Sequence, residues 1–274
     1  MRRLSQRHPT AFVSGASKGL GCAFARMLLA EGVRVWGSSR DPSRLADLSG
    51  GHPGAFFPVV LDLADREGAV RAFDGAGAAA GGAFDIVVNN AGYGVYGEFP
   101  CVESSVWRAQ VDAMLGTVMD LSHAAFRSMR GRGRGCLVHV SSIAAEFPIP
   151  FMCGYNVAKA GLSALSESLM FEARGTGITV IDFRPGDYRT DFNSAMLTDA
   201  PTDATRRSRA ALEAMFASSP RPERAAIDLR RALLRERSGV VRSGSLFQAR
   251  IAPVLARLGP QSWVRRGTAR YFGL

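Results

Sequence analysis

Short apolar runs alternate along most of the chain with longer segments in which apolar residues recur at helical spacing. Strands alternating with helices in this way form parallel sheets that are covered on both faces. The predicted strands are residues 11–14, 33–38, 55–61, 84–88, 136–140 and 178–183. The pattern therefore predicts an α/β fold, a doubly wound parallel sheet with helices on both faces.

Helical periodicity and capping residues define several of the intervening segments. Leu20, Phe24 and Leu28 share one face of a helix that Gly32 ends. A short helix is predicted to start at Pro42, with Asp41 as its cap. A long helix is predicted over Ser105–Arg130, ended by the glycines that follow it, and another over Tyr155–Arg174.

The chain has 274 residues, of which 47% are hydrophobic and 21% charged, enough for one large core. With no internal repeat or long linker, we expect a single domain over residues 1–274, with about 190–274 as substrate cover and basic C-terminal elaboration. No run is long enough to span a bilayer, and the basic start leads into no apolar leader segment. We expect a soluble, cytoplasmic protein.

The cysteines and histidines give no ligand pattern. The four cysteines lie far apart, and the four histidines form no HxxxH or HExxH motif. We therefore expect free thiols and no metal site. The cysteines are Cys22, Cys101, Cys136 and Cys153.

The net charge of +10 belongs to the last quarter of the chain, where residues 201–274 hold 15 arginines against five acids. Only two of the 34 basic residues are lysines, Lys18 and Lys159. A lysine is a compact cation with a tunable pKa, which arginine cannot replace at a tight site. Both lysines are therefore candidates for function.

A glycine-rich turn follows the first predicted strand and opens the first helix. Gly15, Gly19 and Gly21 allow a tight turn and a close approach of the backbone to a pyrophosphate, which the N–H groups at a helix start attract. This predicts a dinucleotide site in a Rossmann-type fold; the alternative is an ordinary strand-to-helix loop.

The spacing of these glycines resembles that of the short-chain dehydrogenase/reductase family. Asn89–Gly92 after the fourth strand, Asp62 after the third and PGDYRT over Pro185–Thr190 also match the family, as do Ser142, Tyr155 and Lys159. These motifs keep the family's order and intervals across residues 10–191. The resemblance implies a hydride-transferring oxidoreductase that forms a homodimer or homotetramer, with contacts through the long helix and the one after it.

The end of the second strand bears on the cofactor. In a nucleotide-binding βαβ unit an acid at this point binds the ribose 2′-OH, whereas a base accommodates a 2′-phosphate. Here Ser39 replaces the acid, and Arg40 and Lys18 supply two cations, which favours NADP(H). Asp41 is the competing acid, although its place before Pro42 suits a helix cap.

The resemblance implies a set of cofactor-binding residues along the same edge. It gives Asp62 and Leu63 to the adenine, Asn89–Gly92 to the region of the adenosine ribose, and Thr190 to the nicotinamide carboxamide. The whole set is Gly15, Ser17, Lys18, Gly19, Leu20, Gly21, Ser39, Arg40, Asp62, Leu63, Asn89, Asn90, Ala91, Gly92, Tyr155, Lys159, Pro185, Gly186 and Thr190.

Reduction of a ketone needs a proton donor beside the carbonyl oxygen. Tyr155 can serve, with Lys159 one helical turn away to favour its phenolate. Ser142 lies 13 residues before Tyr155, the family's spacing, which selects it over Ser141 to hold the carbonyl oxygen. On a solvated helix the same Tyr-x-x-x-Lys pair would be structural.

The long helix departs from the family, whose members carry an asparagine there that supports a water relay to the lysine. In WRAQVDAMLGT the corresponding residue is Met114 or Ala113, depending on the alignment. The difference bears on proton supply, and it motivates an alternative: a nucleotide-binding protein of this fold without catalysis.

Apolar residues beside the predicted site favour a small apolar carbonyl or alcohol as substrate. The alternative is that they form core or a dimer contact. They are Tyr93, Tyr96, Phe147, Pro148, Ile149, Phe151, Met152, Cys153, Met196, Leu197, Met215 and Phe216. In the family's fold, the stretch after Thr190 would be a mobile cover.

The last segment places Phe247, Ile251, Val254, Leu255 and Leu258 at helical spacing. We expect an amphipathic helix that packs on the protein's own pocket or on a partner subunit. Peripheral contact with a membrane is the second possibility and would suit a lipid or sterol-like substrate. Nucleic acid is the least favoured partner, because no recognised binding module is present.

Overall fold

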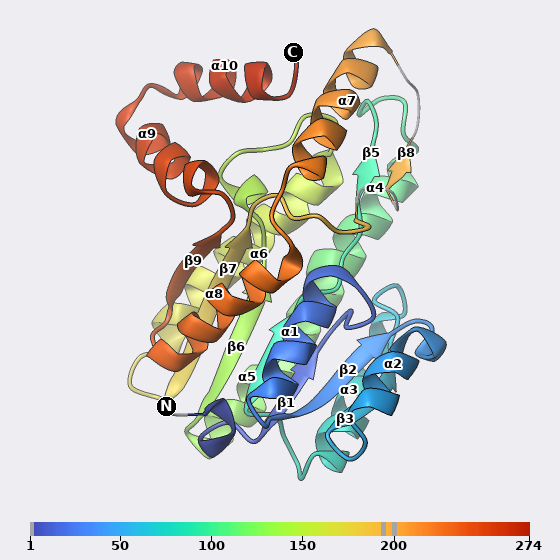
Figure 1. Ribbon diagram of the computed structural model, residues 1–274, viewed down its shortest axis with the longest axis vertical. Helices are drawn as coiled ribbons and strands as arrows, with labels where there is room; N and C mark the ends of the chain where they lie inside the picture. The colour runs from blue at the N-terminus through green and yellow to red at the C-terminus, as the bar shows by residue number, and fades with distance from the viewer. Residues whose placement is uncertain (1–2, 193–195, 199–201) are drawn as a thin grey trace.

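The structure, a computed structural model, describes residues 3–192, 196–198 and 202–274. Its central sheet has seven strands in the order β3-β2-β1-β4-β6-β7-β9, and all neighbours are parallel (Figure 1). The predicted doubly wound parallel sheet is confirmed. Its strands are β1 (Thr10–Val13), β2 (Arg34–Ser39), β3 (Phe56–Val60), β4 (Ile86–Asn89), β6 (Gly135–Val140), β7 (Ile178–Pro185) and β9 (Gly239–Ser243).

The six predicted strands are all present, but the edge strand β9 was not predicted. Its five residues are mostly half-buried and combine two valines with an arginine and a serine, so they give no continuous apolar run. A separate two-stranded pair, β5 (Val95–Tyr96) with β8 (Leu197–Thr198), lies outside the main sheet.

Helices cover the sheet on both faces because successive side chains of a strand point to opposite sides. In β1, Ala11 and Val13 enter the core beneath α1 (Gly19–Ala30), α2 (Ala46–Gly51) and α8 (Pro222–Arg235). Phe12 between them enters the core beneath α3 (Arg66–Ala79), α5 (Thr117–Arg132) and α6 (Cys153–Glu172).

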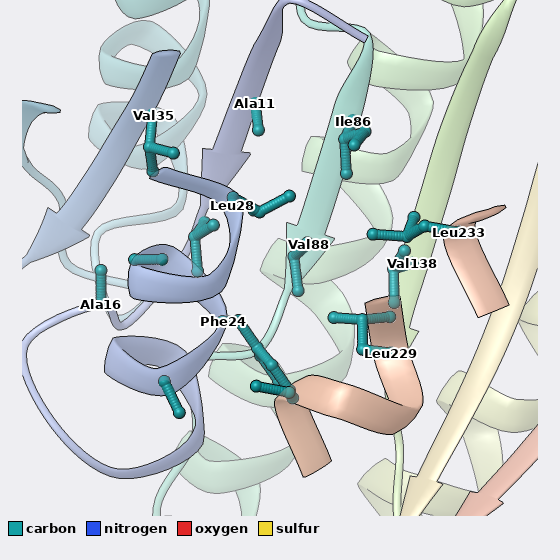
Figure 2. Packing of buried hydrophobic residues seen from close by; sticks show 14 of the residues in the cluster. Ala11, Ala16, Phe24, Leu28, Val35, Ile86, Val88, Val138, Leu229 and Leu233 are labelled. Carbon is teal, nitrogen blue, oxygen red and sulfur yellow. The ribbon is translucent and has the colours of Figure 1, made fainter. Parts of the chain in front are cut away.

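The first of these cores joins α1 to α8, which lie about 200 residues apart in the sequence. Figure 2 shows Phe24 and Leu28 of α1 and Leu229 and Leu233 of α8 over the sheet residue Val138. Each side chain is almost fully buried, which stabilises the fold by about 1.5–3 kcal/mol for a residue of this size. The glycine turn that precedes α1 is thereby fixed on a rigid layer.

The predicted long helix over Ser105–Arg130 is one helical run with a change of register. It comprises α4 (Ser104–Val111), a π-helical turn η3 (Asp112–Gly116) and α5, which ends before Gly133 in the left-handed conformation. A π turn accommodates one extra residue within a helix. It falls on Ala113 and Met114, where the resemblance indicated a departure.

The remaining helices lie in the C-terminal third, where α7 (Asp203–Ala217) precedes α8. The helix predicted from Leu246 begins as a π turn η5 (Phe247–Ile251), followed by α9 (Ala252–Leu258) and then α10 (Gln261–Tyr271). Pro253, which cannot donate a backbone hydrogen bond, accounts for the irregular start. Of the predicted cover, residues 193–195 and 199–201 lie outside the described residues.

Among the described residues there are also short 3-10 turns: η1 (Leu4–Gln6), η2 (Pro42–Leu45) and η4 (Ile143–Ala145). Across the part of the chain that the structure describes, none of the helices has both the length and the apolar character needed to cross a bilayer.

Candidate active site

The predicted site residues gather at the edge of the sheet where its parallel strands end. The glycine turn follows β1, Arg40 follows β2, and Asp62 lies just beyond β3. Asn89–Gly92 begins at the end of β4, Ser142 follows β6, and Pro185 ends β7. Ligands of doubly wound sheets bind along this edge.

The glycine turn leaves no room for side chains. Gly15 has a φ of +67°, and a Cβ there would lie 3.0 Å from the Ala91 Cα. A Cβ on Gly21 would lie 2.1 Å from the carbonyl oxygen of Gly15. The side chain of Lys18 makes no capping hydrogen bond to the first turn of α1. This close-approaching backbone, with the N–H groups of a helix start, fits the pyrophosphate of a dinucleotide.

Two serines that the sequence did not single out, Ser14 and Ser38, hold this turn together with Asn90, which the resemblance had included. The Ser14 hydroxyl accepts hydrogen bonds from the backbone N–H groups of Asn90 (2.8 Å) and Ala91 (3.0 Å). The Asn90 side chain donates to the Ser14 carbonyl at 2.9 Å, and the Gly15 N–H donates to Ser38 Oγ at 3.3 Å. Ser14 directly precedes Gly15, and that position was its only sequence signal.

Two acids of the predicted cofactor edge, Asp41 after β2 and Asp62 after β3, differ in their contacts. Asp41 caps the next turn by accepting from the Ser43 N–H at 3.0 Å, which confirms the helix-cap interpretation. Asp62 is exposed and accepts from the Ala64 N–H at 3.0 Å. Arg40 is exposed and its side chain makes no hydrogen bond or ion pair within the described part of the chain. Burial raises the pKa of Tyr93. The charge of Arg40 acts to lower this pKa and that of Asp62 to raise it, so both charged groups lie near the Tyr93 phenol.

Ser142, Tyr155 and Lys159 are all buried and converge at the end of β6. Tyr155 and Lys159 lie on α6, and the Lys159 Nζ is 5.7 Å from the centre of the Tyr155 ring. Ser142 lies near the Tyr155 phenol and acts to lower its pKa, and the Ser142 hydroxyl accepts a hydrogen bond from the Ala144 N–H at 3.0 Å. Ser141 instead donates to Asp182 in a buried network, so the choice of Ser142 over Ser141 agrees with the geometry.

The ionisation of the pair differs from the sequence expectation. Burial raises the pKa of Tyr155 to about 12, Ser142 acts to lower it, and Asp187 raises it further. Burial also lowers the pKa of Lys159 to about 8, with Asp182 acting in the opposite direction. The Lys159 Nζ donates to the Val140 carbonyl at 2.7 Å rather than to the phenol. Burial therefore affects the pKa of Tyr155 more than the neighbouring lysine does, and it favours the protonated phenol.

Met114 occupies the space behind this pair. It is fully buried in the π turn, and its sulfur accepts from the Tyr93 N–H at 3.5 Å. A Cβ on Gly92 would lie 2.9 Å from the Met114 methyl carbon and 3.9 Å from Lys159 Nζ. Both Met114 and Ala113, the two residues that could correspond to the family's asparagine, are buried and apolar.

Asp187, within the PGDYRT motif, was not singled out by the sequence. It is largely buried, and burial raises its pKa. The Gln248 side chain donates to its carboxylate, and the Tyr271 hydroxyl donates to the same oxygen at 3.4 Å. The two partners come from the end of the chain, so the end of the chain is fixed beside the loop predicted to flank the nicotinamide.

An apolar cluster surrounds Tyr155 on the side away from the sheet. Its buried members include Tyr96, Met152, Met196, Leu212 and Phe272, with Tyr93, Ile149, Phe151, Phe192, Met215 and Phe216 packed against it. Most of the predicted pocket residues are therefore brought together. Leu197 is 58% exposed, and Phe147, Pro148 and Cys153 are not part of the cluster. Phe272 gave no sequence signal.

The cofactor residues towards the nicotinamide end are also adjacent. A Cβ on Gly19 would lie 3.4 Å from the side chain of Thr190. The Gly186 N–H donates to the Ser243 carbonyl at 2.7 Å, which ties the loop after Pro185 to β9. Ser17 and Leu20 are half-buried in the turn, and Leu63 is buried behind Asp62. No group of three histidine, cysteine or acidic side chains in the described ranges is arranged to hold a metal ion.

A hollow of about 910 Å³ lies at the opposite edge of the sheet. Arg7, His8, Arg134 and Glu236 line it, and Arg7 forms an ion pair with Glu236. It contains none of the residues predicted for cofactor or catalysis, so it is separate from this site.

Comparison with known proteins places this site in a family. A serine 3-dehydrogenase of Rhizobium radiobacter is 32% identical over 185 residues, covering 67% of this chain and 73% of that protein. A 3-oxoacyl-[acyl-carrier-protein] reductase of Escherichia coli is 31% identical over 192 residues, covering 69% and 77%. An oxidoreductase of Schizosaccharomyces pombe is 31% identical, and the match spans 68% of this chain but only 63% of that relative's length.

A solved structure extends the likeness beyond these matches. A short-chain dehydrogenase from Streptomyces avermitilis is 28% identical, with a TM-score of 0.83 over 96% of this chain and 99% of that one. The sequence model that describes short chain dehydrogenases matches residues 9–201. Members of this family use NAD(P)(H), and the cradle at Gly15 and Gly21 fits such a group. The chain belongs to the short-chain dehydrogenase/reductase family.

Proposed function

We propose that this protein is an NADP(H)-dependent oxidoreductase that transfers a hydride between nicotinamide and a ketone or secondary alcohol of a small apolar molecule. The observation that carries the proposal is the buried Tyr155 phenol, whose pKa burial raises to about 12, close to Ser142 and Lys159 and bordered by an apolar cluster. A protonated phenol is suited to donate a proton, so reduction of the carbonyl is the favoured direction.

The cofactor would lie along the carboxyl edge of the sheet. The turn from Gly15 to Gly21 would hold the pyrophosphate, Asp62 and Leu63 the adenine, and Pro185–Thr190 the nicotinamide end. When bound, the cofactor supplies the hydride. Ser142 would orient the carbonyl oxygen, Tyr155 would donate the proton to it, and Lys159 would keep a positive charge beside the phenol as the proton leaves.

The preference for NADP(H) rests on charge at the end of β2. Arg40 is exposed and Ser39 is buried, while the neighbouring acid Asp41 is engaged with Ser43. A guanidinium available beside the ribose favours a 2′-phosphate, and the cation of Lys18 adds to it. Arg40→Ala should weaken NADPH binding at least about tenfold and leave NADH binding nearly unchanged.

Arg44 provides the matched control for this test, because it is an exposed arginine four residues away that pairs with Asp41. Arg44→Ala should leave both affinities unchanged. An equal loss of NADPH and NADH affinity in Arg40→Ala would remove the assignment of the 2′-phosphate.

The reaction itself is tested by following NADPH oxidation with ketones, aldehydes, quinones and 3-oxoacyl compounds, and the reverse reaction with secondary alcohols and serine. The 3-oxoacyl compounds and serine are included because of the names of the relatives. We expect turnover with apolar ketones and faster use of NADPH than of NADH.

A second candidate, a nucleotide-binding protein without catalysis, is favoured by one observation: the π turn that contains Ala113 and Met114 has no asparagine for the family's water relay. NADPH binding without oxidation by any compound of the panel would support it. Tyr155 and Lys159 are both buried, and the Lys159 Nζ lies 5.7 Å from the centre of the Tyr155 ring. This arrangement favours an enzyme.

We also propose a homodimer or homotetramer. The outward faces of α5 and α6 expose Met119 (46%), Val157 (56%) and Phe171 (66%), and burial of such side chains stabilises association. Sedimentation velocity of the parent chain and of Val157→Asp tests this, since a charge at the interface should yield monomers. If Val157→Asp sediments with the same mass as the parent chain, contact through α6 is refuted.

A further inference from the structure

The C-terminal arm, residues 245–274, exposes large apolar side chains. Figure 1 shows its helices α9 and α10, in red, outside the two helical layers that cover the sheet. The exposed residues are Leu246, Ile251, Val254, Leu255, Leu258 and Trp263. Leu258 and Trp263 are 81% and 67% exposed. These side chains therefore have no apolar cover within the described part of the chain.

The arm is also uniformly basic. Residues 245–274 contain five arginines and no aspartate or glutamate. Arg250, Arg265, Arg266 and Arg270 are exposed on the same helices as the apolar residues. Apolar and cationic groups thus share the free surface of the arm.

The arm is attached to the body through its other residues. Gln248 and Tyr271 hydrogen-bond to Asp187, and Phe272 is buried in the apolar cluster around Tyr155. The Phe247 and Tyr271 rings stack with centroids 6.5 Å apart, which ties the two ends of the arm together. The exposed side chains are therefore presented by a fixed element.

The combination of charge and exposure selects among possible occupants. A second copy meeting arm to arm would bring two sets of arginines together without a compensating acid. A nucleic acid would satisfy the arginines but leave the leucines and Val254 exposed to water. An anionic lipid surface satisfies both, because apolar side chains enter the acyl boundary while arginines meet the headgroups.

We propose that the C-terminal arm binds the surface of membranes containing anionic lipid, as a peripheral contact. The apolar cluster around Tyr155, which Phe272 completes, then lies beside the docked element. Binding itself does not depend on the proposed reaction, so it is testable even where no substrate turns over.

Trp263 provides a direct readout. The chain has three tryptophans, and Trp36 and Trp107 are buried at 4% and 6% exposure. A blue shift of emission on adding vesicles therefore reports on Trp263 alone. We expect the shift, and co-sedimentation, with vesicles of phosphatidylcholine and phosphatidylglycerol but much less with phosphatidylcholine alone. Raising salt from about 0.05 M to about 0.5 M should weaken binding, because the charges are exposed.

Paired variants separate the two contributions. Arg265→Gln with Arg266→Gln should reduce partitioning into anionic vesicles roughly 20-fold or more, since each surface arginine contributes severalfold. Leu255→Ser with Leu258→Ser should reduce it at least about tenfold through lost apolar burial. The controls make equal changes elsewhere: Arg71→Gln with Arg108→Gln, and Val60→Ser with Ile227→Ser, all at exposed side chains outside the proposed subunit interface.

The control pairs should bind vesicles as the parent does, and Trp263→Phe should abolish the emission shift but not co-sedimentation. Because every substituted residue is exposed, all variants should keep the parent's Tm. The proposal is overturned if the parent ignores anionic vesicles at low salt, or if the control pairs weaken binding as much as the arm pairs. The proposal is also overturned if the parent does not bind vesicles but self-associates, and the arm variants abolish that self-association. That result would assign the arm to contact with a second copy.

Discussion

The catalytic edge, built by residues up to Thr190, and the C-terminal arm differ in what fixes their side chains. At the catalytic edge, Ser142, Tyr155 and Lys159 are buried, and the glycine turn is held by Ser14 and Asn90. In the arm, Gln248, Tyr271 and Phe272 make the contacts with the body, while many larger apolar residues face outwards. Rigid placement suits proton transfer, and a fixed element with a free surface suits binding. The predictions below test this division.

The largest effect is expected at the buried lysine. Lys159 occupies a tight position, with its Nζ donating to Val140 at 2.7 Å, and the larger guanidinium of Lys159→Arg cannot occupy it without displacing neighbours. We expect kcat to fall by about 100-fold or more, within the range of proton-transfer contributions. Lys18 is exposed, so Lys18→Arg, the same change at the other lysine, should keep turnover. Full activity in Lys159→Arg would refute the need for a compact cation.

The next effect concerns the backbone cradle. Gly21→Ala places a Cβ 2.1 Å from the Gly15 carbonyl oxygen, so the turn must shift. We expect NADPH affinity, measured by fluorescence titration, to fall at least about 100-fold, because the pyrophosphate site depends on this backbone. In Gly75→Ala the added Cβ meets nothing within 4 Å, so affinity should be unchanged and the helix stabilised by up to about 1 kcal/mol.

A smaller effect is expected where the arm closes the apolar cluster. Phe272→Ala removes a buried ring beside Tyr155, and for an apolar ketone we expect KM to rise about tenfold with little change in kcat. Phe247→Ala, at a 48% exposed ring of the same arm, should change neither constant. Equal effects of the two substitutions would show that the arm acts through its overall attachment rather than through Phe272.

The smallest effect is expected at Asp187, where the two regions meet. Its negative charge raises the pKa of Tyr155, so Asp187→Asn should lower that pKa. Because reduction requires the protonated phenol, the alkaline limb of the rate profile should move to lower pH by a fraction of a unit. Tyr271→Phe removes a hydrogen bond to Asp187 but no charge, and should leave the limb in place. A shift to higher pH would contradict the assigned influence of Asp187.

Much of the catalytic edge could be predicted from the sequence, because its constraints are local. The apolar runs of the inner strands and the glycines before α1 follow from burial and backbone geometry within a few residues. The Ser142, Tyr155 and Lys159 assignments came from the resemblance, and the structure brings these residues together.

The features that were missed depend on distant partners or on exact register. Asp187 and Gln248 are 61 residues apart, and Phe272 reaches the Tyr155 cluster from the last turn of the chain. The π turn at Asp112–Gly116 leaves the overall apolar pattern helical, so periodicity does not reveal it. The raised pKa of Tyr155 reflects burial by several elements, whereas the sequence shows only the neighbouring lysine.

The most direct test of the central claim compares turnover and cofactor binding in Tyr155→Phe. With the best ketone of the panel, the rate of NADPH oxidation should fall by about 100-fold or more, while the Kd for NADPH stays within about twofold of the parent's. That result would separate proton donation from cofactor placement at the same site. A rate close to the parent's would mean that another group donates the proton, and it would contradict the role assigned to Tyr155.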